Sequence, residues 1–233
     1  MRKLLPAGAG LALTSLLTSL LASLLSAGVP AVAATATGAT TFTIKIVNVS
    51  ANNALKVPGA AAVKAPIAPG AFLVDKSAAI FAPGEPASAG LQSLAEDGNF
   101  EPLQKALVAK FGAQAGMFVP GLEFTVTAKP GDRLSFATMF VQSNDKFYAP
   151  ADGAVALFDA AGEPISGDLT AFVRLFDAGT EIDEQPGAGA NQAPRQMAPN
   201  QGADQNAVVT AADDGYDYPA ASQVIRLEIK AGE

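Results

Sequence analysis

The stretch LEFTVTAKPGDRLSFATMFVQSND, residues 122–145, decides the fold class. Over residues 122–128 apolar residues alternate with polar ones, which is the period of two of a half-buried β-strand. A turn signal, Pro130-Gly131-Asp132, follows. Behind it comes the strongly apolar run RLSFATMFV of residues 133–141. We therefore predict two antiparallel strands that form a hairpin across this turn.

Short segments of similar character recur along the chain and predict further strands. They are residues 41–49, 71–74, 154–158, 169–176 and 223–230. Helical spacing of apolar residues occurs only in residues 87–95 and 101–111. Short strands separated by turn signals, with one small helical insertion, favour an all-β antiparallel sandwich. We expect seven phenylalanines in its core: Phe42, Phe124, Phe136, Phe140, Phe158, Phe172 and Phe176.

The N-terminal residues have the three parts of a secretory signal. Arg2 and Lys3 supply a basic start, residues 11–25 form an uncharged apolar run, and Ala31-Val32-Ala33 fits the exit recognised by signal peptidase. A membrane anchor is the alternative, but the run is shorter than the roughly 20 apolar residues that span a bilayer. We predict a signal peptide over 1–33, a disordered leader over 34–40 and one domain over 41–233. The protein is then secreted, to the periplasm or outside the cell, with no stable membrane span after cleavage.

Composition excludes several kinds of chemistry. The chain has no cysteine and no histidine, so thiolate nucleophiles, imidazole ligands and a Ser-His-Asp triad are ruled out. Without the signal, 15 − 2 = 13 basic residues stand against 22 acidic ones, a formal charge of −9 that argues against nucleic acid as a partner. The remaining ligand atoms are oxygens, which suit calcium or magnesium.

The acidic residues are concentrated in the second half of the chain. Thirteen of the 22 lie between Asp145 and Asp217, opposed only by Lys146, Arg174 and Arg195. Most come just after a predicted strand, so several carboxylates would meet at one end of a sandwich. A bound divalent cation relieves their mutual repulsion. The other interpretation is a solvated acidic rim that binds nothing specific.

Two positions are the strongest candidates for such a site. Gln142-Ser143-Asn144-Asp145 directly follows the apolar strand of residues 133–141. Asp177-Ala178-Gly179-Thr180-Glu181 directly follows the strand of residues 169–176. In the second, Gly179 permits a tight turn that could bring Asp177 and Glu181 to one centre.

Four segments in order resemble the spondin N-terminal domain, and most closely its bacterial, single-domain secreted members. They are ASAGLQSLAEDG (87–98), LSFATMFVQSND (134–145), LFDAGTE (175–181) and PGAGANQAPRQ (186–196). The resemblance covers nearly all of the domain. In the animal relatives F-spondin and mindin this domain is a C2-like β-sandwich with a calcium ion near one end. The resemblance implies that Asp145, Asp177 and Glu181 ligate Ca²⁺ in this chain. The animal domains have Asp where this chain has Glu181, and they contain cysteines.

Three functions fit these observations. The first is a secreted, calcium-binding module, not an enzyme, that binds an extracellular or cell-surface ligand and serves adhesion. The second is an extracellular hydrolase of glycosidase type that uses paired carboxylates. The third is a structural surface protein that associates with itself. The long polar segment 184–206 is expected to be a partner-binding surface or a flexible cover.

Overall fold

Short antiparallel strands dominate the chain in its computed structural model, which describes residues 38–232. The elements are β1 (Thr40–Asn48), β2 (Gly70–Asp75), α1 (Ala89–Asp97), α2 (Glu101–Phe111), β3 (Ala115–Phe118), β4 (Glu123–Ala128), β5 (Arg133–Met139), β6 (Lys146–Pro150), β7 (Val155–Ala156), β8 (Gly167–Asp168), β9 (Val173–Asp177), β10 (Thr210–Ala211), α3 (Ala221–Val224) and β11 (Ile225–Ala231). The expected signal peptide lies outside the described residues, as does most of the leader. Among the described residues, no helix is long and apolar enough to cross a membrane.

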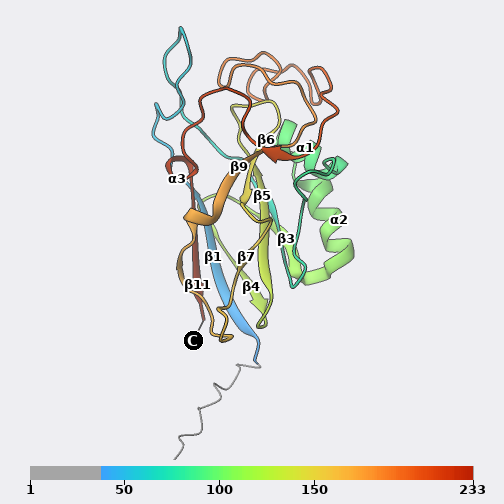
Figure 1. Cartoon of the computed structure of the whole chain (residues 1–233), viewed down its shortest axis with the longest axis vertical. Coiled ribbons are helices and arrows are strands. Elements are labelled where there is room, and N and C mark those ends of the chain that lie inside the picture. The colour runs from blue at the N-terminus through green and yellow to red at the C-terminus, as the bar shows by residue number, and fades with distance from the viewer. Residues whose placement is uncertain (1–37, 233) are drawn as a thin grey trace, which may run out of the picture. The chain divides into compact units, whose positions relative to one another are not determined.

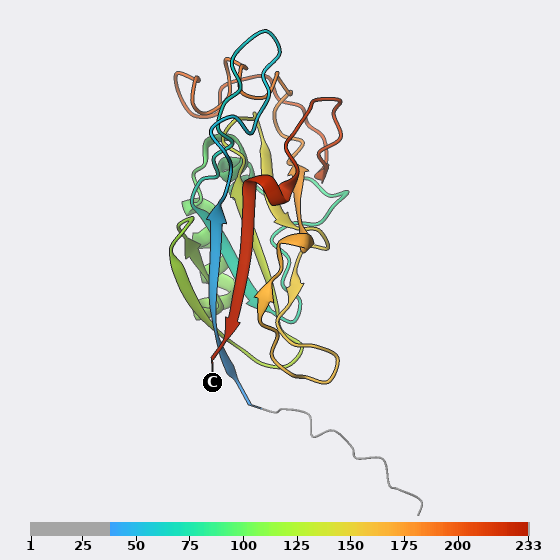
Figure 2. The same ribbon diagram turned by 90° about the vertical axis from the view of Figure 1, so that its left-hand side faces the viewer.

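The strands form two antiparallel sheets, which confirms the predicted all-β sandwich with a small helical insertion. The smaller sheet has the order β4-β1-β11-β8, and the larger has the order β10-β9-β6-β5-β2-β3. β7 also belongs to the larger sheet and pairs with the first two residues of β5. β1 and β11 pair along nearly their whole length, from Phe42 opposite Ala231 to Asn48 opposite Ile225. Figure 2 shows these two strands, blue and red, side by side.

The core between the sheets follows from the alternation in the smaller one. In β1, Phe42, Ile44 and Ile46 are fully buried, whereas their neighbours are partly or fully exposed. They belong to one apolar cluster with Phe72 of β2 and Phe136 of β5. One face of the smaller sheet is therefore in the core and the other faces solvent, as is usual for antiparallel sheets.

The larger sheet is covered on its second face as well. α1 and α2 supply Leu91, Leu94 and Leu103 to a separate apolar cluster that includes Phe147 and Phe176 of the sheet. In Figure 1 the two helices lie against this sheet. The strands β2, β5 and β6 are consequently buried on both faces, and most of their residues are apolar.

Two expectations were wrong. The segments on either side of Pro130-Gly131-Asp132 do not form a hairpin, because β4 pairs with β1 while β5 pairs with β2 and β6. The turn, closed by a 2.9 Å hydrogen bond from Asp132 N–H to the Lys129 carbonyl, carries the chain from one sheet to the other. Phe172 is 54 % exposed and not in the core, since it lies in a 3-10 turn before β9.

Candidate functional site

The connection between β5 and β6 brings two buried polar side chains to one end of the larger sheet. Ser143 shapes it: its hydroxyl donates to the Phe140 carbonyl (2.7 Å) and accepts from the Lys146 N–H (3.0 Å). The next two residues, Asn144 and Asp145, are both fully buried. This tight turn directs their side chains into the protein. Asn144 is the centre of one polar network, and Asp145 belongs to a second one around Lys146.

The second contribution comes from the turn after β9. Asp177 lies opposite Lys146 on the neighbouring strand β6. Its Oδ1 accepts a 2.7 Å hydrogen bond from Gly179 N–H, which closes the turn. Gly179 has φ +69°, and a Cβ there would lie 2.6 Å from the Val208 carbonyl oxygen, so the turn requires glycine. The N–H groups of Thr180 and Glu181 then donate to Asp145 Oδ2 at 2.7 and 3.1 Å.

An ammonium group lies among the carboxylates at this point. The Lys146 side chain is fully buried, and its Nζ contacts four aspartates. The distances are 2.8 Å to Asp177 Oδ2, 3.2 Å to Asp214 Oδ2 and 3.6 Å to Asp145 Oδ1, and Nζ also donates to Asp183 Oδ1. Four carboxylates against one ammonium give a formal charge of −4 + 1 = −3 if all are ionised.

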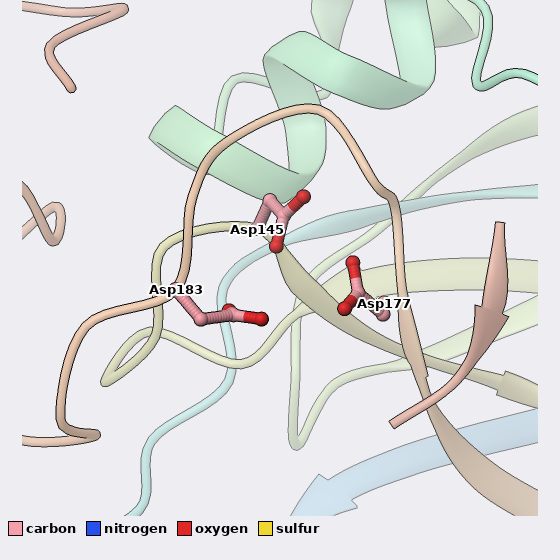
Figure 3. Close-up of side chains that lie close together, drawn as sticks. All are labelled: Asp145, Asp177 and Asp183. Atoms are coloured by element: carbon pink, nitrogen blue, oxygen red, sulfur yellow. The ribbon is translucent and has the colours of Figure 1, made fainter. Parts of the chain in front are cut away.

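Three of these aspartates are close enough to share an ion. One oxygen from each of Asp145, Asp177 and Asp183 lies within 4.8 Å of the other two. Figure 3 shows the three carboxylates around a common space, drawn from the β5–β6 connection, the end of β9 and the following loop. Asp145 Oδ1 has no hydrogen-bond partner although the side chain is fully buried. An unpartnered buried carboxylate oxygen is costly, so this atom fits a cation ligand.

The excess of negative charge shows in the acid–base properties of the cluster. Burial raises the pKa of Asp145, and the neighbouring Asp177 adds to the effect. Burial also raises the pKa of Asp183, to about 7, against the opposing effect of Lys146. The Lys146 pKa is raised as well: burial alone would lower it, but the charges of Asp145 and Asp177 outweigh burial. The cluster therefore stabilises the charged form of Lys146 and destabilises the ionised forms of Asp145 and Asp183.

Glu181 belongs to a second network, centred on Asn144. The Asn144 amide donates to Glu181 Oε1 (3.0 Å) and Glu184 Oε2 (3.2 Å), and its oxygen accepts from Glu184 N–H (2.9 Å) and from Gln192 Nε2 (3.2 Å). Glu181 Oε2 is buried without a hydrogen-bond partner. Burial raises the pKa of Glu181 to about 7, and Glu96 contributes to the increase.

The segment 184–206 covers this second network. Gln192 is fully buried and donates to the Gln185 carbonyl (3.0 Å). Arg195 donates to Gln142 Oε1 (3.0 Å), and Gln196 donates to Asp97 Oδ1 at the end of α1 (2.9 Å). In Figure 1 this part of the chain, in orange, lies above β6, β9 and α1. Its first half is therefore tied to the site, and its end is tied as well, since Gln205 N–H donates to the Thr180 carbonyl (3.0 Å). Met197 between them is 95 % exposed.

The structure brings together part of the predicted ligand set. Asp145 and Asp177 lie in one group, but the third carboxylate of that group is Asp183 and not Glu181. The Glu181 backbone supports Asp145, while its side chain turns to Asn144. The turn at Gly179 forms as expected, but it does not direct Asp177 and Glu181 to one centre.

Sequence reasoning missed Asp183, Asp214 and the central role of Lys146. One signal was available: only three basic residues oppose the thirteen acids of residues 145–217, and one of them directly follows Asp145. A lone lysine in such a context indicates an internal counter-ion, because lysine is rarely fully buried unless paired. Nothing in the local sequence connects Asp214 with Lys146, because Asp214 follows the long segment 184–206 and meets the ammonium only in the folded chain.

Fold and site together define an antiparallel β-sandwich with a buried, lysine-centred carboxylate cluster at one end. A comparison with models of protein families finds no match, and a comparison with curated proteins finds no match either. Membership of the spondin family therefore stays a prediction from the sequence.

Proposed function

We propose that this chain is an exported module of spondin type that binds Ca²⁺ through Asp145, Asp177 and Asp183. The bound ion would fix the loops at that end of the sandwich, and those loops would bind an extracellular or cell-surface ligand. The protein would serve binding or adhesion and not catalysis.

One observation carries the calcium proposal: the fully buried Asp145 Oδ1 has no hydrogen-bond partner and lies among carboxylates that outnumber their counter-ion. Like charges at this density repel, and a divalent cation is the simplest compensation. Its ligands would come from the β5–β6 connection, the end of β9 and the loop that follows β9. Calcium accepts irregular oxygen sets of this kind, whereas magnesium requires a near-octahedral one.

The arrangement supports a binding role better than hydrolysis. Among five of the surface hollows on residues 38–232, with volumes of 210 to 590 Å³, one reaches the turn at Gly179 and Thr180. None of the five is lined by the carboxylates of the site, Asp145, Asp177, Asp183 and Glu181. A glycosidase needs its two carboxyl groups in a cleft on either side of the scissile bond. Residues 197–208, in the long loop at this end, are exposed. An ion bound in the buried cluster would therefore alter the shape of a binding surface without being accessible itself.

Thermal unfolding in CaCl₂ and in chelator tests the proposal. At a calcium concentration 100 times the dissociation constant, the ion should stabilise the fold by about 2.7 kcal/mol. Asp145→Asn, which removes the charge of the unpartnered oxygen, should abolish most of this gain. Asp132→Asn, at the turn between the sheets, should retain it. Equal melting temperatures of the natural protein in calcium and in chelator would remove the ion from the proposal.

The partner requires a separate test, because the ion and the ligand are independent claims. Sedimentation at increasing protein concentration, with and without calcium, distinguishes self-association from a monomeric binding module. A monomer that shows calcium-dependent binding to extracellular matrix or cell surfaces supports the proposal. Concentration-dependent assembly supports the structural surface protein.

A further inference from the structure

Lys146 occupies the position that a cation ligated by Asp145, Asp177 and Asp183 would need. Its Nζ lies 2.8 Å from Asp177 Oδ2 and 3.6 Å from Asp145 Oδ1, and it donates to Asp183 Oδ1. These are the three members of the cluster whose oxygens lie within 4.8 Å of one another. The point close to all three carboxylates is therefore the point where the ammonium lies.

The two occupants exclude each other for steric and electrostatic reasons. A calcium ion binds its oxygens at about 2.3–2.6 Å, so an ion shared by the three carboxylates takes the space of Nζ. An ammonium and a divalent cation at such a short separation also repel strongly, because burial leaves little water to screen them.

We propose that Lys146 is an internal competitor for the cation site, and that binding of a divalent cation displaces its ammonium from Asp145, Asp177 and Asp183. This inference rests on the proposed function, since it concerns the same carboxylates. In the absence of the ion, Lys146 holds the β5–β6 connection and the loop after β9 together. In its presence the ion does so, and the affinity for the ion is lower than the carboxylates alone would give.

Asp214 provides the displaced ammonium with a place to go. Its Oδ2 lies 3.2 Å from Nζ, but Asp214 is not one of the three clustered carboxylates. Tyr218 donates to the same oxygen (2.7 Å) and Tyr216 N–H to the other (3.0 Å), so the carboxylate is held in place independently of Lys146. The ammonium can therefore keep one partner when it gives up the other three.

Calorimetric titration with CaCl₂ tests the competition. Lys146→Met removes the ammonium and keeps an unbranched side chain. Lys146→Met combined with Asp214→Asn removes one charge of each sign, so that a folded protein with all three proposed ligands remains available if the single variant does not fold. Both should bind calcium at least about tenfold more tightly, because no ammonium occupies the place between the three carboxylates. The gain should be smaller in the double variant, which also loses the negative charge of Asp214. Lys146→Arg, which keeps the charge, and Lys105→Met, on the exposed face of α2, should not gain affinity.

The outcomes separate this inference from the proposed function. If the natural protein binds no calcium but the double variant does, the competition is real and the natural protein is held by its lysine alone. If both bind with equal affinity, calcium binding stands and the competition is wrong. If neither binds, the inference is overturned together with the calcium site.

Acylation of lysines followed by peptide mass mapping supplies a readout of the displacement itself. The fully buried Lys146 should resist the reagent in chelator. In saturating calcium it should react at least about tenfold faster, because the displaced ammonium keeps only Asp214, whose side chain is partly exposed. The exposed Lys105 provides the reference rate. Unchanged protection of Lys146 in a protein that has bound calcium would show that ion and ammonium occupy separate places, and would overturn the inference.

Discussion

Asn144 and Lys146 are two residues apart and organise the same end of the sandwich by different chemistry. Around Asn144 a neutral amide connects Glu181, Glu184 and Gln192, and both its donor and its acceptor atoms have partners. Around Lys146 a single ammonium faces four aspartates. Each network leaves one buried carboxylate oxygen without a hydrogen bond, Glu181 Oε2 in the first and Asp145 Oδ1 in the second. The Asn144 amide is fully hydrogen-bonded, whereas the ionic network is short of positive charge.

The difference determines what each network responds to. The Asn144 amide has no donor or acceptor left for a ligand, so it mainly gives the loop its shape. A cluster with surplus negative charge is stabilised by protons and by cations, so its contribution depends on the solution. The loops at this end of the protein therefore have one attachment centred on an amide and one that depends on cations.

The largest effect is expected from Lys146→Met in chelator. Removal of one partner of a buried ion pair leaves uncompensated charge, so the free energy of unfolding should fall by about 3–5 kcal/mol. Urea denaturation measures it. Lys105→Met, at an exposed position of α2, should stay within about 0.5 kcal/mol of the natural protein. A comparably small loss for Lys146→Met would mean that the ionic network is not a structural attachment.

A smaller loss, about 2–3 kcal/mol, is expected from Asn144→Leu, because buried carboxylate and amide groups lose their partners. In contrast to Lys146→Met, this loss should be the same in calcium and in chelator. Asn53→Leu, on an exposed loop, is the matched control. A calcium-dependent loss for Asn144→Leu would show that the two networks act as one.

Tyr218→Phe sharpens the comparison within the ionic network. It removes the 2.7 Å hydrogen bond to Asp214 but leaves all charges in place, so a loss of about 1–2 kcal/mol is expected. Tyr216→Phe removes a neighbouring hydroxyl group and should cost less. An equal loss in both variants would assign the effect to packing and not to the support of Asp214.

The smallest effect is a pH dependence of a few degrees in melting temperature. Asp183 and Glu181 have pKa values raised to about 7 by burial, so the folded chain binds more protons than the unfolded chain between about pH 4 and 7. Stability should therefore fall as the pH rises through this window and level off above it. Asp183→Asn should flatten the profile in chelator, whereas Asp159→Asn, in a surface turn, should not. A melting temperature that rises from pH 5 to 7 would contradict the assignment.

The sequence predicted the elements better than their pairing. The segment 101–111 is helical over the expected residues, and Gly98 ends α1 in the left-handed conformation with φ +69°. These features are local, so the sequence specifies them. β6 was missed because its five residues begin with a lysine and end with a proline, so they show neither alternation nor a long apolar run. The exchange of sheets after β4 was missed because a turn signal does not show which strand the next segment joins.

For the site, too, the sequence predicted local features better than the contacts between distant segments. Asp145 and Asp177 were found because each follows an apolar strand, a feature of the local sequence. Asp183 was missed because the path of the loop after the turn decides which carboxylate points inward. Glu181, only two residues away, points to Asn144 instead. Lys146 was counted only as an opposing charge, although its place at the start of β6 puts it directly opposite Asp177.

The pairing of β1 with β11 has a consequence for how the chain acquires its structure. Phe42 and Ala231 lie opposite each other although they are 231 − 42 = 189 residues apart in the sequence. Contacts between such distant residues form slowly, because a long loop must be closed first. The smaller sheet is completed only when the C-terminal strand has been synthesised. Until then β1 lacks one of its two neighbouring strands. A chain that is synthesised or exported N-terminus first therefore cannot complete the sandwich until its last strand is present.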